Sequence, residues 1–171
     1  MPKAKYQYED FLATVSDDCK GFVSAVHEML LQEKYKPKVQ VMKSTGLQLS
    51  YAESRVKGVI GIILLFFMCE GKLMIRIYGK NHANYPKVLN GLSEKIVSQV
   101  DKADDCKKFI DPQKCWTGCA GYDFRIREKR FQKCLVNCFQ LEVDSESMPD
   151  ISGLIESESK ERCGAWGTVV P

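Results

Sequence analysis

The spacing of apolar residues predicts an amphipathic helix near the N-terminus and a β-hairpin directly after it. From Tyr8 to Lys34 apolar side chains recur at helical intervals, and Gly21 is a point where this helix could bend. Apolar and polar residues then alternate over 39–42 and 47–51, on either side of a Thr-Gly turn. This pattern predicts two strands with one solvated face.

A second hairpin and a second helix follow in the same pattern. The apolar run 59–69 has too few polar residues for an edge strand, so we expect it at the centre of a sheet, paired with the alternating segment 72–78. Apolar residues at helical spacing from Tyr85 to Val100, after a possible N-cap at Asn84, predict a helix. Helices on both sides of a run of strands favour an α+β fold, with an antiparallel four-stranded sheet.

The composition of the chain changes at residue 104. Two alternating segments, 122–127 and 139–144, predict strands on either side of a basic turn at 128–130, and a final helix opens at Ser147. We therefore expect an α-ββββ-α unit over 1–103. A cysteine-rich hairpin and a C-terminal helix over 104–171 would pack on it as one globular body.

Four cysteines in this second part form two pairs with equal spacing. Cys115 and Cys119 are separated by three residues, as are Cys134 and Cys138. Four soft ligands in two close pairs are typical of a tetrahedral structural zinc site. Cys106 is a fifth candidate, which could replace one of the four ligands.

Other interpretations of the cysteines stay open. The commonest zinc knuckles place two residues between cysteines rather than three. An iron–sulfur cluster ranks below zinc, and disulfide or redox pairs and plain buried thiols are further alternatives. The unpaired Cys19, Cys69 and Cys163 are better explained as core or surface thiols.

The chain has only two histidines, which disfavours a catalytic zinc site. His27 lies in the first predicted helix, and we interpret it as structural or exposed. His82 lies in a polar loop between a strand and a helix, where residues are free to serve a site. A cleft formed by Arg76, Tyr78, His82 and Tyr85 is therefore an alternative site, for a small-ligand sensor or an enzyme.

Basic and aromatic residues alternate in the second half of the chain. This arrangement is typical of single-stranded nucleic-acid surfaces, although a strand with one solvated face explains it equally well. The candidate partner surface consists of Arg125, Arg127, Lys129, Arg130 and Lys133.

Composition and charge limit the class of protein. With 171 residues, 44% hydrophobic and 27% charged, the chain has globular proportions, and its net charge of +3 does not by itself indicate a polyanion partner. The N-terminus carries no secretory signal pattern, and the 11-residue run 59–69 is too short to cross a membrane. We expect a cytoplasmic protein with reduced thiols and no membrane association.

Several segments resemble a group of uncharacterised proteins of clostridial bacteria. They are Lys72–Tyr78, Gly121–Phe124 and the four cysteines 115, 119, 134 and 138. The resemblance covers the chain from Tyr8 to about Glu161. It implies a bacterial, cytosolic setting and carries no assigned activity.

The pattern favours a non-enzymatic binding or regulatory module with a structural zinc site formed by four cysteines. A protein is the expected partner, and a nucleic acid is second. The alternatives are the His82 cleft and a thiol redox sensor that uses Cys106. The sequence assigns no oligomeric state.

Overall fold

The protein is described by a computed structural model over residues 6–53, 61–80, 82–115 and 119–164. These residues form an α+β fold, as the sequence pattern predicts. The backbone divides into two compact units, one of residues 1–77 and 142–149, the other of residues 78–141 and 150–171. The composition change at residue 104 therefore falls inside the second unit.

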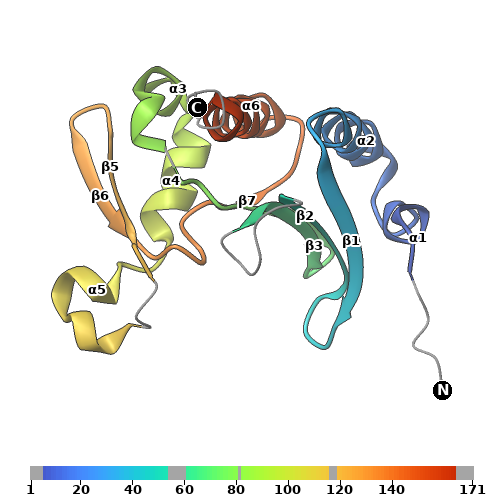
Figure 1. The fold of residues 1–171 in the computed structure, drawn as a ribbon, viewed down its shortest axis with the longest axis horizontal. Coiled ribbons are helices and arrows are strands. Elements are labelled where there is room, and N and C mark those ends of the chain that lie inside the picture. The colour runs from blue at the N-terminus through green and yellow to red at the C-terminus, as the bar shows by residue number, and fades with distance from the viewer. Residues whose placement is uncertain (1–5, 54–60, 81, 116–118, 165–171) are drawn as a thin grey trace, which may run out of the picture. The chain divides into compact units, whose positions relative to one another are not determined.

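The described residues of the first unit include two helices and four strands of the main sheet (Figure 1). The helices contact strands β1 and β2. The elements are α1 (Tyr8–Leu12), α2 (Asp17–Gln32), β1 (Tyr35–Met42), β2 (Gly46–Glu53), β3 (Ile62–Cys69) and β4 (Lys72–Ile77).

The single helix predicted from Tyr8 to Lys34 is two helices. The Thr14 hydroxyl donates to the Phe11 carbonyl at 2.7 Å, and Ser16 has extended backbone angles at the start of α2. A threonine that bonds back to the chain competes with helix continuation. Gly21, the expected bend, lies inside α2.

The main sheet has five strands, in the order β1-β2-β3-β4-β7, where β7 is Gln140–Glu142. The prediction of four strands is wrong, because the segment after residue 139 joins this sheet rather than a hairpin with 122–127. Strand β3 is central as predicted, and Ile63 to Phe67 are all buried. Val59 and Ile60, the start of the predicted strand, lie outside the described residues.

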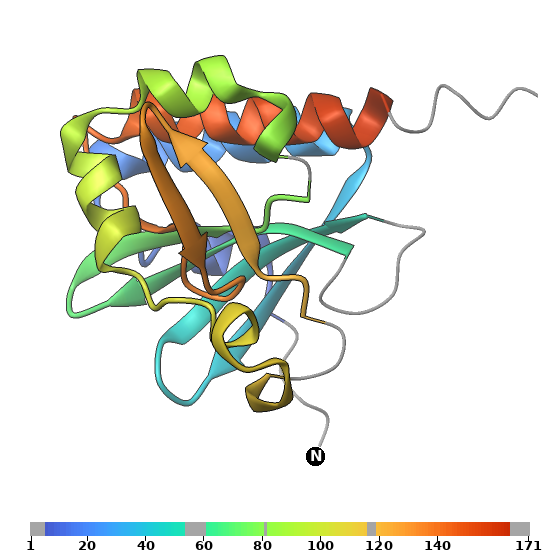
Figure 2. The same ribbon diagram turned by 90° about the vertical axis from the view of Figure 1, so that its left-hand side faces the viewer.

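The second unit contains the cysteine-rich segment (Figure 2). The helix predicted from Tyr85 to Val100 is divided, because Ser93 caps a new helix by accepting a hydrogen bond from the Ile96 amide at 3.4 Å. The elements are η2 (His82–Asn84), α3 (Pro86–Gly91), α4 (Glu94–Lys102), α5 (Lys107–Ile110), η3 (Pro112–Lys114), β5 (Tyr122–Ile126), β6 (Lys129–Lys133) and α6 (Met148–Gly164), whose first two residues belong to the first unit.

Strands β5 and β6 form a separate antiparallel hairpin. They are joined by a two-residue turn in which Arg127 has a positive φ of 53°. This tight turn lets β5 pair with the segment immediately after it, which explains why β7 is free to join the main sheet. In the described residues of the chain, no helix is long and apolar enough to cross a membrane.

Candidate functional site

Five cysteines converge on the open end of the β5–β6 hairpin. Because Tyr122 pairs with Lys133, Cys119 just before β5 and Cys134 just after β6 flank the same end. Cys138 is tied to Cys134 by a backbone hydrogen bond of 3.0 Å, from the Cys138 amide to the Cys134 carbonyl. The Cys115 thiol lies near enough to Cys119 to raise the pKa of the Cys119 thiol. The register thus brings both predicted pairs to one end of one element.

Cys106 is fixed beside the same end by backbone pairing. Its amide donates to the Gln132 carbonyl at 3.0 Å, and the Cys134 amide donates to the Asp104 carbonyl at 2.9 Å. Its sulfur lies against Gly121, where an added Cβ would approach it to 2.6 Å. Gly121 also has a φ of 67°, so both its conformation and its surroundings favour glycine. Helix α5 follows Cys106 at this end of the hairpin (Figures 1 and 2).

The environment of Cys119 contains features that favour a thiolate and features that oppose it. Burial raises the pKa of the Cys119 thiol, and the neighbouring Cys115 thiol raises it further. A hydrogen bond from the Gly121 amide and the nearby Lys108 ammonium lower the pKa. Lys108 also donates to the Cys119 carbonyl. Burial is the largest of these influences, so the pKa of the Cys119 thiol lies above its ordinary value.

Cys138 is the most enclosed of the five thiols, with no exposed surface. Burial raises the pKa of the Cys138 thiol, and Lys133 opposes this shift. Over the described ranges 6–53, 61–80, 82–115 and 119–164, no three His, Cys, Asp or Glu side chains lie close enough to hold one metal ion. The two cysteine pairs are therefore neighbours at one end of the hairpin rather than a closed tetrahedron.

A second cluster in this unit is a buried ion pair on α6. Arg162 Nε donates to Glu158 Oε1 at 2.8 Å, and the two side chains are 2% and 0% exposed. Glu158 also accepts from the Lys80 amide at 2.7 Å and from the Tyr85 hydroxyl at 2.9 Å. Arg162 donates to the Tyr78 carbonyl at 2.5 Å. The pair therefore anchors the loop between β4 and α3 to α6.

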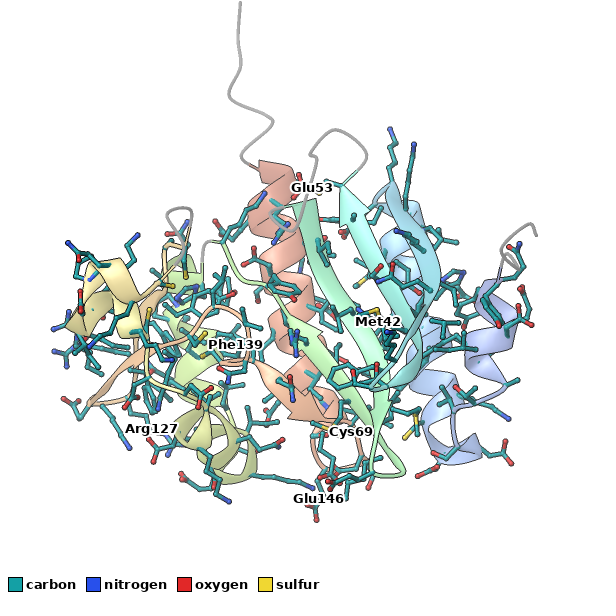
Figure 3. The ribbon with its side chains drawn as sticks, turned by 90° about the horizontal axis from the view of Figure 1, so that it is seen from below. Met42, Glu53, Cys69, Arg127, Phe139 and Glu146 are labelled. Carbon is teal, nitrogen blue, oxygen red and sulfur yellow. The ribbon has the colours of Figure 1, made fainter. Side chains whose placement is uncertain are left out.

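His82 lies inside an aromatic box next to this ion pair. Its ring packs edge-on against Tyr122 and Phe124, with centroid distances of 4.6 and 5.0 Å, and Phe139, labelled in Figure 3, lies 6.2 Å away. Among the described residues neither ring nitrogen has a hydrogen-bond partner. Burial lowers the pKa of His82, while the charges of Glu158 and Asp123 raise it.

The structure brings together three of the four residues of the predicted cleft. Tyr78, His82 and Tyr85 lie in the second unit, and all three are engaged with or packed against α6 or β5 residues. Tyr78 and His82 are buried, so they form interior packing. Arg76 belongs to β4 of the first unit, where its guanidinium lies 5.7 Å from the Phe67 ring centroid.

The basic residues of the predicted partner surface are paired within the second unit. Arg130 forms a bidentate contact with Asp123, which lowers the pKa of that carboxyl to about 2. Lys133 is buried and donates to Asp105 and to two carbonyls near the end of α4. Arg125 donates to the carbonyl of Glu128 within the turn.

Two further ion pairs cross a groove between α4 and the hairpin turn. Arg127, at the outer edge of the side chains in Figure 3, pairs with Glu94, and Lys129 pairs with Asp101 at 2.6 Å. The groove has a volume of about 490 Å³ and an apolar floor of Val97, Ile126 and Phe131. A phosphate ligand would have to compete with these intramolecular carboxylates.

Sequence reasoning missed the Glu158–Arg162 pair. The sequence feature that could have indicated this pair is the four-residue spacing of Glu158 and Arg162 within an acidic helix. Charged residues at this spacing usually lie on a solvated helix face. It also missed a half-buried contact in the first unit, where His27 Nδ1 lies 2.7 Å from the Tyr51 hydroxyl and the His27 ring stacks on Tyr8. That contact agrees with the structural role expected for His27. The Cys19 thiol, 3.6 Å from the Val143 carbonyl, is a core thiol as expected.

Comparison of the chain with protein-family models, with curated proteins and with solved structures finds no match.

Proposed function

We propose that the protein is a non-enzymatic binding or regulatory module, in which Cys115, Cys119, Cys134 and Cys138 hold a structural zinc ion. One observation carries the proposal: the hairpin register gathers both cysteine pairs at one end of β5–β6. Four thiolates would close the coordination sphere and leave no position for a substrate. Zinc would then tie the segment before β5 to the segment after β6.

The charges around the thiols support this proposal. Four thiolates and one Zn²⁺ carry a net charge of about −2. The ammonium of Lys108 acts on Cys119, and that of Lys133 acts on Cys138. Each pair therefore has one nearby cation that offsets part of the charge. Cys106, held beside Gly121, is the replacement ligand in this proposal.

A protein is the partner that the surface favours. The described residues of the second unit expose three large apolar side chains, Phe109, Ile110 and Val136. Each lies within four residues of a cysteine in the sequence. Apolar surface supports protein contacts, whereas the internal pairing of the basic residues weakens the case for nucleic acid. The bacterial, cytoplasmic setting implied by the resemblance belongs to the same proposal.

The test is the metal content of the full chain, purified without chelator, together with three single variants. We expect about one zinc per chain. Cys115→Ser and Cys134→Ser should lose zinc and become less stable, because a structural zinc site contributes directly to folding. Cys69→Ser is the matched control, since Cys69 is an exposed thiol in the first unit. Less than about half an equivalent of zinc, with stability indifferent to Cys115→Ser, would refute the proposal.

A further inference from the structure

The His82 imidazole is a buried polar group that the described chain leaves without a hydrogen-bond partner. The residue is 7% exposed, and neither ring nitrogen meets a donor or acceptor among the described residues. The rings of Tyr122 and Phe124 pack against it and offer no strong acceptor. A polar group buried in this state lowers the free energy of unfolding, so nearly all such groups in folded proteins bind a protein atom or an ordered water.

Three polar atoms of the second unit converge beside Gly79. His82 Nδ1, the Tyr85 hydroxyl and Glu158 Oε2 lie 3.3, 3.4 and 3.6 Å from the position that a Cβ on Gly79 would take. The backbone of Gly79 does not lie in the left-handed region, so its conformation does not require glycine. A side chain at this position would enter the space between the three atoms. Glycine therefore leaves room for a small polar molecule.

The hydrogen-bonding capacities of these atoms define what could bind there. Glu158 is paired with Arg162, so its carboxylate only accepts, and the Tyr85 hydroxyl already donates its proton to Oε2 at 2.9 Å. A neutral imidazole carries one N–H and one lone pair. A molecule between His82 and Glu158 must therefore donate to the carboxylate and bond to Nδ1. The short distances around Gly79 restrict it to about the size of water.

We propose that one internal water molecule binds beside Gly79 and bridges His82 Nδ1 to Glu158 Oε2. The water accepts from Nδ1–H and donates to the carboxylate, and the Tyr85 hydroxyl oxygen can accept its second hydrogen. Internal waters typically make about three such bonds to buried polar groups. The bridge adds a contact between η2 and α6, where the Lys80 amide already binds Glu158. The site does not depend on the proposed zinc ion.

The first test is a high-resolution crystal structure of the full chain, grown without ammonium salts. We expect a density peak within about 3.2 Å of both His82 Nδ1 and Glu158 Oε2. Gly79→Ala should lose this peak, because the added methyl group occupies the space. Gly91→Ala should keep it, since a Cβ on Gly91 meets no atom within 4 Å. If Gly79→Ala does not fold, His82→Phe, which removes Nδ1, should lose the peak instead.

The second test is the histidine tautomer in solution. At about pH 8, above the ordinary histidine pKa of 6.5, nitrogen NMR of the imidazole should show the proton of His82 on Nδ1. His27→Gln identifies the signals of the only other histidine. A proton on Nε2, the lack of a peak at Nδ1 in the parent crystal, or a peak that persists unchanged in Gly79→Ala would each overturn the inference.

Discussion

The two units differ in what fills their interiors. In the described residues of the first unit the buried polar side chains are two serines, Ser50 and Ser147, and the core consists of apolar side chains around β3. In the second unit Lys133, Glu158 and Arg162 are all buried, along with His82. Burial of charged groups is costly unless every charge is paired.

The two units therefore differ in the interactions that stabilise them. The first unit follows the hydrophobic pattern, so removal of apolar area governs its folding. The second unit also has an apolar core, and in addition it contains buried polar contacts and the thiols at the hairpin end. Removing one partner of such a contact leaves the other partner buried and unsatisfied, which lowers the free energy of unfolding. A metal that joins the thiols would add a further constraint at the hairpin end of this unit.

The largest effect is expected from removal of one partner of the buried ion pair. Glu158→Ala leaves the Arg162 guanidinium buried without its carboxylate, which costs about 3–5 kcal/mol of unfolding free energy. Glu156→Ala, on an exposed residue of the same helix, is the control. Urea unfolding measures both variants. A loss below about 1 kcal/mol for Glu158→Ala would show that this pair does not anchor the second unit.

A glycine comparison isolates the contact at the cysteine end. Gly121 and Gly46 have nearly equal positive φ angles of 67° and 68°, but only Gly121 would place a Cβ against a sulfur. Both alanine variants carry the backbone strain, and the clash with Cys106 and with the Phe109 ring, 2.9 Å from the added Cβ, should add about 1–3 kcal/mol to Gly121→Ala alone. Thermal unfolding measures the difference. Equal losses for the two variants would show that Cys106 and Phe109 are not held against Gly121.

Acid should weaken the second unit through His82. Burial lowers its pKa below the ordinary value of 6.5, so the unfolded chain binds a proton before the folded chain does. The stability contribution is therefore complete above pH 6.5 and is lost as the pH falls from 6.5 through the folded pKa. His82→Phe should flatten this part of a stability curve measured against pH. His27, whose pKa burial also lowers, contributes in the same direction, so His27→Gln is the comparison. An unchanged slope in His82→Phe would contradict the buried neutral imidazole.

The smallest effect is expected at the groove. Arg127 and Glu94 form an exposed ion pair, for which the typical contribution is at most about 1 kcal/mol. Arg127→Met should cost no more than this in unfolding free energy at low salt, and the loss should shrink when salt is added. A loss of several kcal/mol of unfolding free energy that persists in high salt would show that this ion pair behaves as a buried one.

The sequence predicted more of the first unit than of the second. Period-two alternation determines which residues of β1–β4 form strands, and the apolar run determines that β3 is central. Alternation does not determine a strand's partner, so the segment at residue 140 was assigned to the wrong sheet. Local hydrogen bonds of Thr14 and Ser93 divided two helices that periodicity alone predicts as continuous.

The candidate site could likewise be predicted from the sequence only in part. Spacing alone identified the four paired cysteines, and the register brings them to one end of the hairpin. The buried pair of Glu158 and Arg162 could not be predicted, because its partners lie some 80 residues away at the end of β4. The burial of Lys133 could not be predicted for the same reason. Its position in an alternating basic strand is typical of a solvated face, but three acceptors near α4 bind its ammonium in the interior.

We propose that a metal held by four cysteines stabilises the second unit, while the first unit is stable through its apolar core. Hydrogen–deuterium exchange of the full chain, with and without a strong zinc chelator, tests it most directly. We predict that chelation speeds amide exchange across 104–106 and 119–138 and leaves β2, β3 and β4 protected. Equal protection with and without chelator throughout 119–138 would contradict the claim.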